Sequence, residues 1–356
     1  MDRREFLGYC VKAGATLGLT GISACTTATP GVSQADRTEL TGLRIADAHA
    51  HPHQLHGSKS YDPTTPTVEM MKRVGMSACS FSAVGDWVKY PGRSGIAHSD
   101  TQAQLRKVRA FEEHKQVHVI RHTPDLQAMA FPADALGAIM AIEGGDALED
   151  SIKLLDSFFE DGVRLITVLH DHNNAIGVNQ RSQTDGPLTR FGIQVIERMN
   201  ALGIVVDVAH AKTKTLQGIV DVSAAPVIDS HTSLLPSGSN PSRPTRLRTW
   251  AEMEMVAKTG GLICTWPLAY SVGNQQRTTV KHWAEEVLQM KTRLGIEHCG
   301  LGTDGGGDLP RTVEGWDSIS SLPNLIGAMK EVGLSQEDIG AYAGGNFLRI
   351  LTKCIG

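Results

Sequence analysis

The chain has 356 residues, which is enough for about two average domains or for one large α/β barrel. Its 34 Lys and Arg residues against 38 Asp and Glu residues give a net charge of −4, so it has no basic surface for nucleic acid or anionic lipid. Hydrophobic residues make up 41% and charged residues 20% of the chain, which excludes a disordered or low-complexity protein. Six cysteines are too few for a disulfide scaffold, and Cys79, Cys264 and Cys299 lie in apolar runs where buried thiols are expected.

The first residues have the order of an export signal. Arg3 and Arg4 precede a weakly apolar run of small residues, 11–24, as in a twin-arginine signal. The run is shorter than the roughly 20 apolar residues that a membrane-spanning helix needs. We therefore expect residues 1–24 to direct export to the periplasm or envelope of a bacterium, with an ordinary cytosolic N-terminus as the alternative.

The end of this run resembles a lipobox. Residues 21–25 read Gly-Ile-Ser-Ala-Cys, which would make Cys25 the lipidated first residue of the mature protein. Residues 25–40 would then be a tether, and the only membrane contact would be through the lipid. A soluble periplasmic product is the alternative.

From Leu43 onward, short apolar runs alternate with amphipathic segments, a pattern typical of βα units and a parallel sheet. The continuous apolar character of the runs suits strands that are buried on both faces. Eight such runs occur, at 43–49, 77–84, 137–143, 163–170, 203–210, 226–231, 261–266 and 299–304.

Helical periodicity fills the intervals between these runs. Apolar residues at helical spacing predict helices within 191–202, 249–258 and 280–294, and Ser335 with Asp338 predicts the start of a C-terminal helix through about 351. A ninth run at 117–122 is expected to be an insertion strand. Eight strands alternating with helices predict a (β/α)8 barrel as one domain over residues 41–356, with a doubly wound open sheet as the competing topology.

Acidic and imidazole side chains stand at the carboxyl ends of six of the eight runs. In a barrel these ends meet on one face, where barrel active sites are built. Several imidazoles and carboxylates together suit a divalent transition metal. The residues are Asp47, His49, His51, Glu143, His170, His210, His231 and Asp304.

The spacing of these residues indicates a pair of metal ions. His49 and His51 are two positions apart on a strand, so they lie on the same face and can bind one ion together. Glu143 is placed to bridge that ion to a second one, held by His210 and His231. A bridged pair of metals acidifies a shared water and stabilises a tetrahedral species, so hydrolysis is the expected reaction class.

Eight segments carry a resemblance that extends from Leu43 almost to the C-terminus. They are DAHAH (47–51), AIEGGDAL (141–148), GVRLITVLHDHNNAIG (162–177), GPLTRFG (186–192), LGIVVDVAH (202–210), PVIDSHTS (226–233), GIEHCGLGTDGGGD (295–308) and GGNFLRIL (344–351). In this order they resemble the membrane (renal) dipeptidases, which are binuclear zinc peptidases with an amidohydrolase-type barrel.

The resemblance implies two zinc ions per chain, although another divalent metal is possible. His49 would bind the first zinc, Glu143 would bridge the two, and His210 and His231 would bind the second. The family usually has His-x-Asp at the first strand, whereas His51 stands at the Asp position here. A neutral ligand in place of a carboxylate raises the net charge of the site by one, and imidazole remains a good zinc ligand.

The resemblance also implies roles in catalysis and substrate binding. His170 would stabilise the oxyanion of the tetrahedral intermediate, and Asp304 would move the proton from the attacking water to the leaving amine. An arginine would hold the carboxylate of the substrate, and counting back about fourteen residues from the Gly-Gly at 260–261 selects Arg246, with Arg243 as second choice.

The functional hypothesis is therefore a zinc-dependent dipeptidase acting on a small dipeptide-like substrate. A second hypothesis keeps the metals but changes the substrate to a lactone, a cyclic amide or a phosphoester. A third is a non-catalytic surface lipoprotein that uses the barrel as a binding module. The loop at 56–66 has no match in the family, and the resemblance also implies a homodimer.

Overall fold

Eight parallel strands form a nearly closed barrel in the order in which they occur along the chain. The structure is a computed structural model that describes residues 39–58, 62–128, 136–237, 239, 245–272 and 275–356, which all fall in one compact unit. Each predicted run overlaps one barrel strand, with boundaries that differ by a few residues. The strands are β1 (Ile45–Ala50), β2 (Met76–Val84), β4 (Leu136–Glu143), β5 (Val163–Thr167), β6 (Val205–Asp207), β7 (Ile228–Thr232), β8 (Leu262–Thr265) and β11 (Cys299–Leu301).

The barrel closes between β1 and the segment that follows β11. The backbone N–H of Asp304 donates to the carbonyl of His49 at 2.8 Å, and that of His51 donates to the carbonyl of Gly305 at 2.8 Å. The side chain of Asp47 accepts hydrogen bonds from Thr303 at the same seam. This closure confirms the barrel and excludes the open doubly wound sheet.

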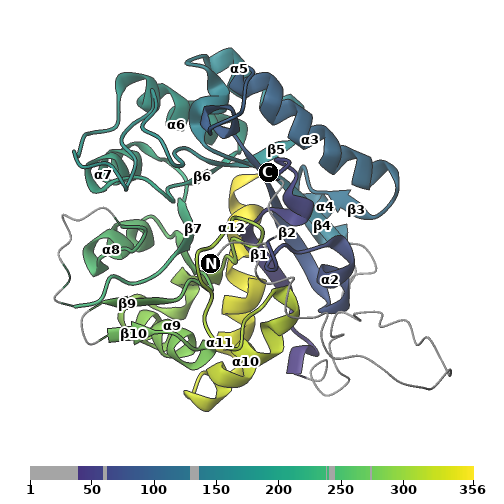
Figure 1. The fold of residues 1–356 in the computed structure, drawn as a ribbon, viewed down its shortest axis with the longest axis vertical. Helices are drawn as coiled ribbons and strands as arrows, with labels where there is room; N and C mark the ends of the chain where they lie inside the picture. Colours follow the sequence, from purple (N-terminus) through teal and green to yellow (C-terminus); the bar gives the residue numbers. More distant parts are fainter. Residues whose placement is uncertain (1–38, 59–61, 129–135, 238, 240–244, 273–274) are drawn as a thin grey trace, which may run out of the picture. The chain divides into compact units, whose positions relative to one another are not determined.

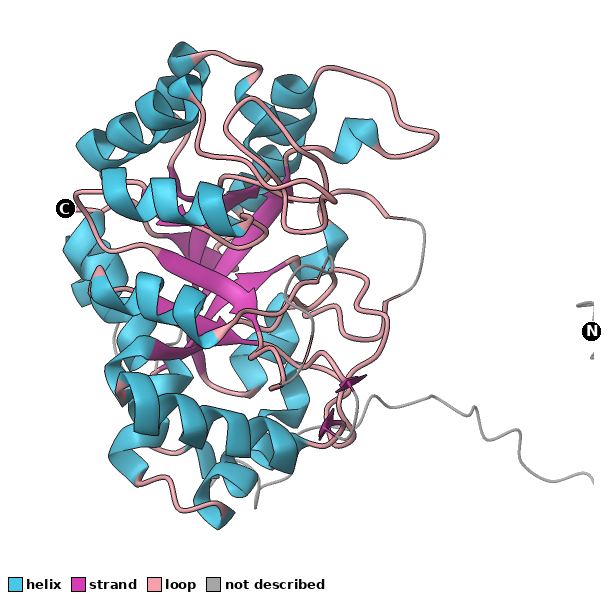
Figure 2. Ribbon diagram, turned by 90° about the vertical axis from the view of Figure 1, so that its left-hand side faces the viewer, coloured by secondary structure: helices cyan, strands magenta, loops and turns pink. Residues whose placement is uncertain are grey.

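Helices surround the strands on the outside of the barrel (Figures 1 and 2). The helices predicted at 191–202, 249–258 and 280–294 are confirmed, and each begins after a threonine that caps the first turn through its side chain. The helices are α2 (Val68–Arg73), α3 (Ala97–Glu113), α4 (Thr123–Ala128), α5 (Ile152–Glu160), α6 (Arg190–Leu202), α7 (Thr213–Val222), α8 (Trp250–Lys258), α9 (Val280–Leu294), α10 (Leu322–Glu331), α11 (Gln336–Gly340) and α12 (Asn346–Cys354).

Two apolar clusters stabilise the barrel. The larger one lies between the strands and the surrounding helices. The smaller one joins side chains inside the barrel, such as Ala78, Leu165 and Ile228, with Phe347 and Ile350 of α12. The helix α12 contacts β1, β6, β8 and β11, and it lies in the middle of the ring in Figure 1. It therefore closes the amino end of the barrel and leaves the carboxyl ends of the strands as the open mouth.

The C-terminal helix differs from its prediction. Ser335 and Asp338 form the expected capping box, but the helix is not continuous to 351. A short π-helical segment, η7 (Ala341–Gly345), separates α11 from α12, and Gly344 departs from helical geometry. A Cβ atom on Gly344 would lie 2.3 Å from the carbonyl oxygen of Arg44, so the helix breaks where it passes against the start of β1.

Three further strands lie outside the barrel order. The insertion strand predicted at 117–122 is present as β3 (Val117–Val119), which pairs with the first residues of β4. A hairpin of β9 (Tyr270–Val272) and β10 (Gln275–Arg277) was not predicted. Cys79, Cys264 and Cys299 are buried free thiols, as expected.

The N-terminal predictions concern residues outside the described part of the chain. The export signal at 1–24 lies there, as do residues 25–38 of the tether predicted at 25–40, and Arg243. Within the residues that the structure describes, no helix has the length and apolar character needed to cross a membrane.

A buried ion pair holds the ends of β6 and β7 together. The guanidinium of Arg248 is almost fully buried, and it donates to Asp229 at 2.6 Å and to the carbonyls of Val208 and Ala211 at 2.7 and 2.5 Å.

We expect Arg248→Met to lower the free energy of unfolding by about 3–5 kcal/mol, because it leaves the carboxylate of Asp229 buried without a counter-charge. Urea denaturation measures this loss. The matched control is Arg293→Met, since Arg293 is half exposed and pairs with Glu254 on the surface, and it should cost less than about 1 kcal/mol. Equal losses in the two variants would contradict the anchoring role of the buried pair.

Candidate metal centre

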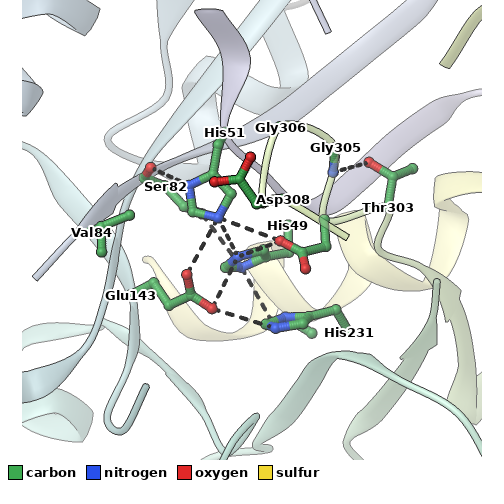
Figure 3. Close-up of polar contacts among 12 residues, drawn as sticks. His49, His51, Ser82, Val84, Glu143, His231, Thr303, Gly305, Gly306 and Asp308 are labelled. Atoms are coloured by element: carbon green, nitrogen blue, oxygen red, sulfur yellow. Dashed lines mark hydrogen bonds and ion pairs between the residues drawn. The ribbon is translucent and has the colours of Figure 1, made fainter. Parts of the chain in front are cut away.

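The open mouth of the barrel gathers imidazoles and carboxylates from six strand ends. Figure 3 shows His49, His51, Glu143 and His231 turned toward one another. The metal-ligand candidates and Asp304 are at most 7% exposed. The contributing residues are His49 from β1, His51 directly after β1, Glu143 from β4, His170 after β5, His210 after β6, His231 from β7 and Asp304 after β11.

The first group of ligand atoms forms around the end of β1. The Nε2 atoms of His49 and His51 lie 3.3 Å apart, which agrees with the two-residue spacing expected for side chains on one face. An Oδ1 atom of Asp304 lies 3.8 Å and 3.4 Å from these two nitrogens, respectively. The carboxylate of Glu143 lies 3.4 Å from His49 and 3.3 Å from His51.

The second group lies on the other side of the same glutamate. The Nε2 atoms of His210 and His231 are 3.1 Å apart. The Oε1 atom of Glu143 lies 3.0 Å from His210 and 3.4 Å from His231. Glu143 therefore contacts both groups, as the sequence predicts for a bridging carboxylate.

Hydrogen bonds on the outer nitrogens orient the imidazoles. The Nδ1–H group of His51 donates to the carbonyl oxygen of Ser82 at 3.0 Å. Nδ1 of His231 lies 2.8 Å from the hydroxyl of Ser230, which itself donates to Asp207 at 2.6 Å and so accepts from the ring. In both rings Nε2 is left facing the centre of the site, as in metal-binding histidines.

The electrostatics of the site suit a divalent cation. Burial, together with neighbouring positive groups, holds the pKa values of His210 and His231 well below the usual value, so both rings are neutral and offer lone pairs. Burial also tends to lower the pKa of His51, but hydrogen bonds and charge from Asp304 and Glu143 outweigh it and raise the pKa to about 10. The carboxylates thus attract positive charge to this point.

Among the residues that the structure describes, three groups of three donors have their ligand atoms within 4.8 Å of one another. Each contains imidazole nitrogens and a carboxylate oxygen, the donors that zinc and related metals prefer. The residues present therefore fit a metal centre. The groups are His49 with His51 and Asp304, His49 with Glu143 and His231, and Glu143 with His170 and His210.

Two site residues have unusual backbone geometry. His210 has φ of 64° and Asp304 has φ of 50°, the left-handed region that residues other than glycine seldom adopt. Each such residue costs about 1–3 kcal/mol and persists where the surrounding structure holds it, which is common at functional sites. Here each residue lies three positions after the end of a strand, and each lines the cavity at the mouth.

A cavity of about 260 Å³ lies above the centre. Its lining includes Trp87 and Tyr90, which follow β2, and Arg246 and Trp266, which follow β7 and β8. In the order of the eight strands, β7 is four positions from β2 and therefore lies across the mouth from it. Trp87 and Tyr90 thus form an aromatic wall on one side of the cavity, and Arg246 forms a basic wall on the other.

Of the arginines considered, Arg246 lies in the cavity. Its guanidinium is buried, donates to the side-chain oxygen of Gln180 at 2.9 Å, and lies 5.3 Å from the centroid of the Trp266 ring. Burial lowers the pKa of Arg246 to about 10, so the group remains charged at neutral pH. The guanidinium of Arg248 is instead paired with the carboxylate of Asp229, and Arg243 is outside the described residues.

The unmatched loop at 56–66 contributes to the cavity where it is described. His56 lines the cavity. Thr64 accepts a hydrogen bond from the N–H of Gly306 at 3.0 Å, and Asp62 accepts one from the N–H of Asp308 at 3.1 Å. The loop therefore supports the glycine-rich turn that follows the catalytic candidate Asp304.

His170 lies at the edge of the centre, with Nε2 3.4 Å from Glu143 and Nδ1 2.7 Å from Asp86. Burial tends to lower its pKa, but the charges of Glu143 and Asp86 raise it to about 9. The sequence reasoning missed Asp86 and Gln180. Asp86 stands two residues after β2, so extending the search for polar strand ends to that loop would have found it.

A parallel barrel that carries paired imidazole and carboxylate donors at the carboxyl ends of its strands defines the class of metal-dependent barrel hydrolases. The model of the membrane dipeptidase family, peptidase family M19, matches residues 47–354. The chain belongs to this family, which places it among the metallopeptidases.

Individual relatives agree with this assignment. Dipeptidase tcpJ of Claviceps purpurea is 29% identical over 238 residues, which cover 65% of this chain and 54% of that protein. The chain thus spans about half the length of the curated relatives it matches.

Solved structures share the barrel fold. An amidohydrolase from Pseudomonas aeruginosa is 18% identical with a TM-score of 0.74, covering 90% of this chain and 99% of that one. A metallopeptidase from Rhodobacter sphaeroides, liganded with a phosphinate mimic of the dipeptide L-Ala-D-Ala, is 17% identical with a TM-score of 0.72, covering 88% and 99%.

We expect zinc to stabilise the metal-free protein, by about 2.7 kcal/mol when its concentration is 100 times the dissociation constant, because a ligand that binds the folded state shifts the unfolding equilibrium. Thermal unfolding after chelator treatment, with and without added zinc, measures this effect. His49→Ala should reduce the shift, whereas His114→Ala, on an exposed helix end, should retain it in full. An equal response of both variants would place the zinc site elsewhere.

Proposed function

We propose that the protein is a zinc-dependent dipeptidase that hydrolyses the amide bond of a dipeptide. The observation that carries this proposal is the position of Glu143, whose carboxylate lies within 3.4 Å of an imidazole nitrogen in each of the two ligand groups. A carboxylate shared between two sets of imidazole donors, below a cavity with a buried arginine, suits a binuclear amide hydrolase.

The ligand set divides between two ions. His49 and His51 would hold the first, His210 and His231 the second, and Glu143 would contact both. Two zinc ions would supply a water acidic enough to attack at neutral pH and would polarise the scissile carbonyl. The presence of His51 where the family has Asp leaves room for a different metal preference.

The basic wall would bind the substrate carboxylate. A guanidinium matches a carboxylate with two parallel hydrogen bonds, and Arg246 is pre-oriented by Gln180 and by the Trp266 ring. A dipeptide held there would extend across the centre toward the aromatic wall. The limited volume of the cavity, about 260 Å³, favours two residues over a longer peptide.

Two further side chains would act on the reacting bond. His170 would donate a hydrogen bond from Nε2 to the carbonyl oxygen as it gains negative charge. Asp304 would accept a proton from the attacking water and pass it to the leaving nitrogen. The water oxygen bonds to the carbonyl carbon, the carbon–nitrogen bond breaks, and two amino acids result.

A second candidate is a binuclear metal hydrolase of a lactone, a cyclic amide or a phosphoester. The observation that favours it is His51, which adds a neutral ligand where the family has a carboxylate and so changes the charge of the centre by one. The requirement for a substrate carboxylate separates this candidate from the dipeptidase.

We also propose that residues 1–24 direct export and that Cys25 carries a lipid. The order of the arginine pair, the apolar run and the small residues before Cys25 supports this.

The first expected result is about two zinc ions per chain after purification without chelator, with release of amino acids from a dipeptide panel. Glu143→Gln should remove most of the activity, because it takes away the charge that the two ligand groups share. Elemental analysis and an amino-acid release assay on the same preparation measure both quantities. Two metals without cleavage of any dipeptide would favour the second candidate, and a metal-free chain would contradict both.

The second expected result concerns the arginine. Arg246→Ala should raise the KM for a dipeptide by about 30-fold or more, a loss of at least about 2 kcal/mol for a buried charged pair. Hydrolysis of the same dipeptide with an amidated C-terminus should be little affected by the substitution. The matched control is Arg181→Ala, at the exposed rim of the cavity, which should leave the KM within a few-fold. An equal loss on the free and amidated substrates would rule out carboxylate binding by Arg246.

A further inference from the structure

Asp86 places a fully buried carboxylate directly against His170. Its side chain is 0% exposed, and Oδ1 lies 2.7 Å from Nδ1 of the ring. The carboxylate accepts, so the Nδ1–H group donates. The second oxygen, Oδ2, has no hydrogen-bond partner among the described residues and lies 3.8 Å from Nε2 of His172. A carboxylate buried in this way is costly unless it has a charged or strongly polar partner, and its close partner is His170.

Two glycines allow this contact to form. The N–H of Gly85 donates to the carbonyl of Glu143 at 2.6 Å, and a Cβ atom on Gly85 would lie 2.1 Å from the carbonyl oxygen of Gly144. Gly144 has φ of 108°, and a Cβ atom there would lie 3.3 Å from the backbone nitrogen of Asp86 and 3.4 Å from Cβ of His170. The segments after β2 and β4 therefore approach closely enough for Asp86 to reach the ring.

The contact determines which nitrogen of His170 faces the substrate. With Nδ1 bound to Asp86, Nε2 is turned toward the centre and lies 3.4 Å from Glu143. The His170 ring also packs edge-on against the His210 ring, with centroids 4.8 Å apart. The side chain of His170 is 14% exposed and lines the cavity, so Nε2 is within reach of a bound molecule.

We propose that Asp86 is a positioning residue for the reaction. It fixes the ring of His170 with Nε2 toward the carbonyl oxygen of the substrate, and its negative charge stabilises the donating ring as charge develops on that oxygen. Partners of this kind orient functional histidines in other sites. The inference rests on the proposed function, because it assigns to Asp86 a part in the same hydrolysis.

The kinetic test compares Asp86→Asn and Asp86→Ala with the parent protein, all loaded with zinc. We expect kcat on a dipeptide to fall by about 10- to 100-fold in both variants, with KM changed less than about threefold and the zinc content unchanged. The matched control is Glu286→Gln, which neutralises a buried carboxylate that pairs with Arg277 away from the mouth, and it should retain kcat. Full kcat in Asp86→Asn, or an equal loss in Glu286→Gln, would overturn the proposal.

A double-mutant cycle separates positioning from a general structural effect. If Asp86 acts through the ring, Asp86→Asn should cause no further loss of kcat in a His170→Asn background. A loss of the same factor in both backgrounds would show that Asp86 acts by another route and would overturn the proposal.

A third measurement does not depend on turnover. The protein is labelled with ¹⁵N-histidine, loaded with zinc and measured by NMR. The ring signals that vanish in His170→Asn belong to His170. We expect Asp86→Asn to shift these signals. If the parent protein cleaves no dipeptide, the proposed function fails, and this spectrum still decides whether Asp86 controls the ring. Unshifted His170 signals would overturn the inference by themselves.

Discussion

The site depends on the hydrogen bonds that join β1 to the segment after β11. The carbonyl of His49 accepts from the N–H of Asp304, and the next bond joins His51 to Gly305. Residues that are more than 250 positions apart in the sequence thus become neighbours in one ladder. Because His49, His51 and Asp304 all lie on this ladder, closure of the barrel also brings the first group of donor atoms together.

Charge balance is the second constraint on this mouth. Buried carboxylates and imidazoles are each unfavourable alone, yet here they compensate one another at distances of 3.0–3.8 Å. Charged partners also lie one layer further out. Asp86 contacts His170, and Asp207 accepts a hydrogen bond from the Ser230 hydroxyl that orients His231. The family of the chain, the donor set and the cavity with Arg246 all agree with the chemistry of a metallopeptidase.

Periodicity predicted the barrel well because each buried strand carries a continuous apolar run, and the convergence of parallel strand ends predicted that His49, Glu143, His210 and His231 would meet. Features that depend on two backbone segments passing close to each other could not be predicted from the hydrophobic pattern. The contact of Asp86 with His170 requires the crossing at Gly85 and Gly144, and the break at Gly344 requires the backbone of β1 to lie against it. Counting along the chain selected Arg246. The ion pair of Arg248 with Asp229 could not be predicted in this way, because spacing does not show which residues meet in the fold.

The inner apolar cluster links the first barrel strand with the last helix, since α12 closes the amino end of the barrel and packs against β1. During synthesis, the first strand leaves the ribosome long before the helix that completes its packing. A nascent chain therefore exposes the donors of β1 without the partners that shape the metal centre. The donor groups at the mouth therefore reach their final arrangement only after the C-terminal helix has been synthesised.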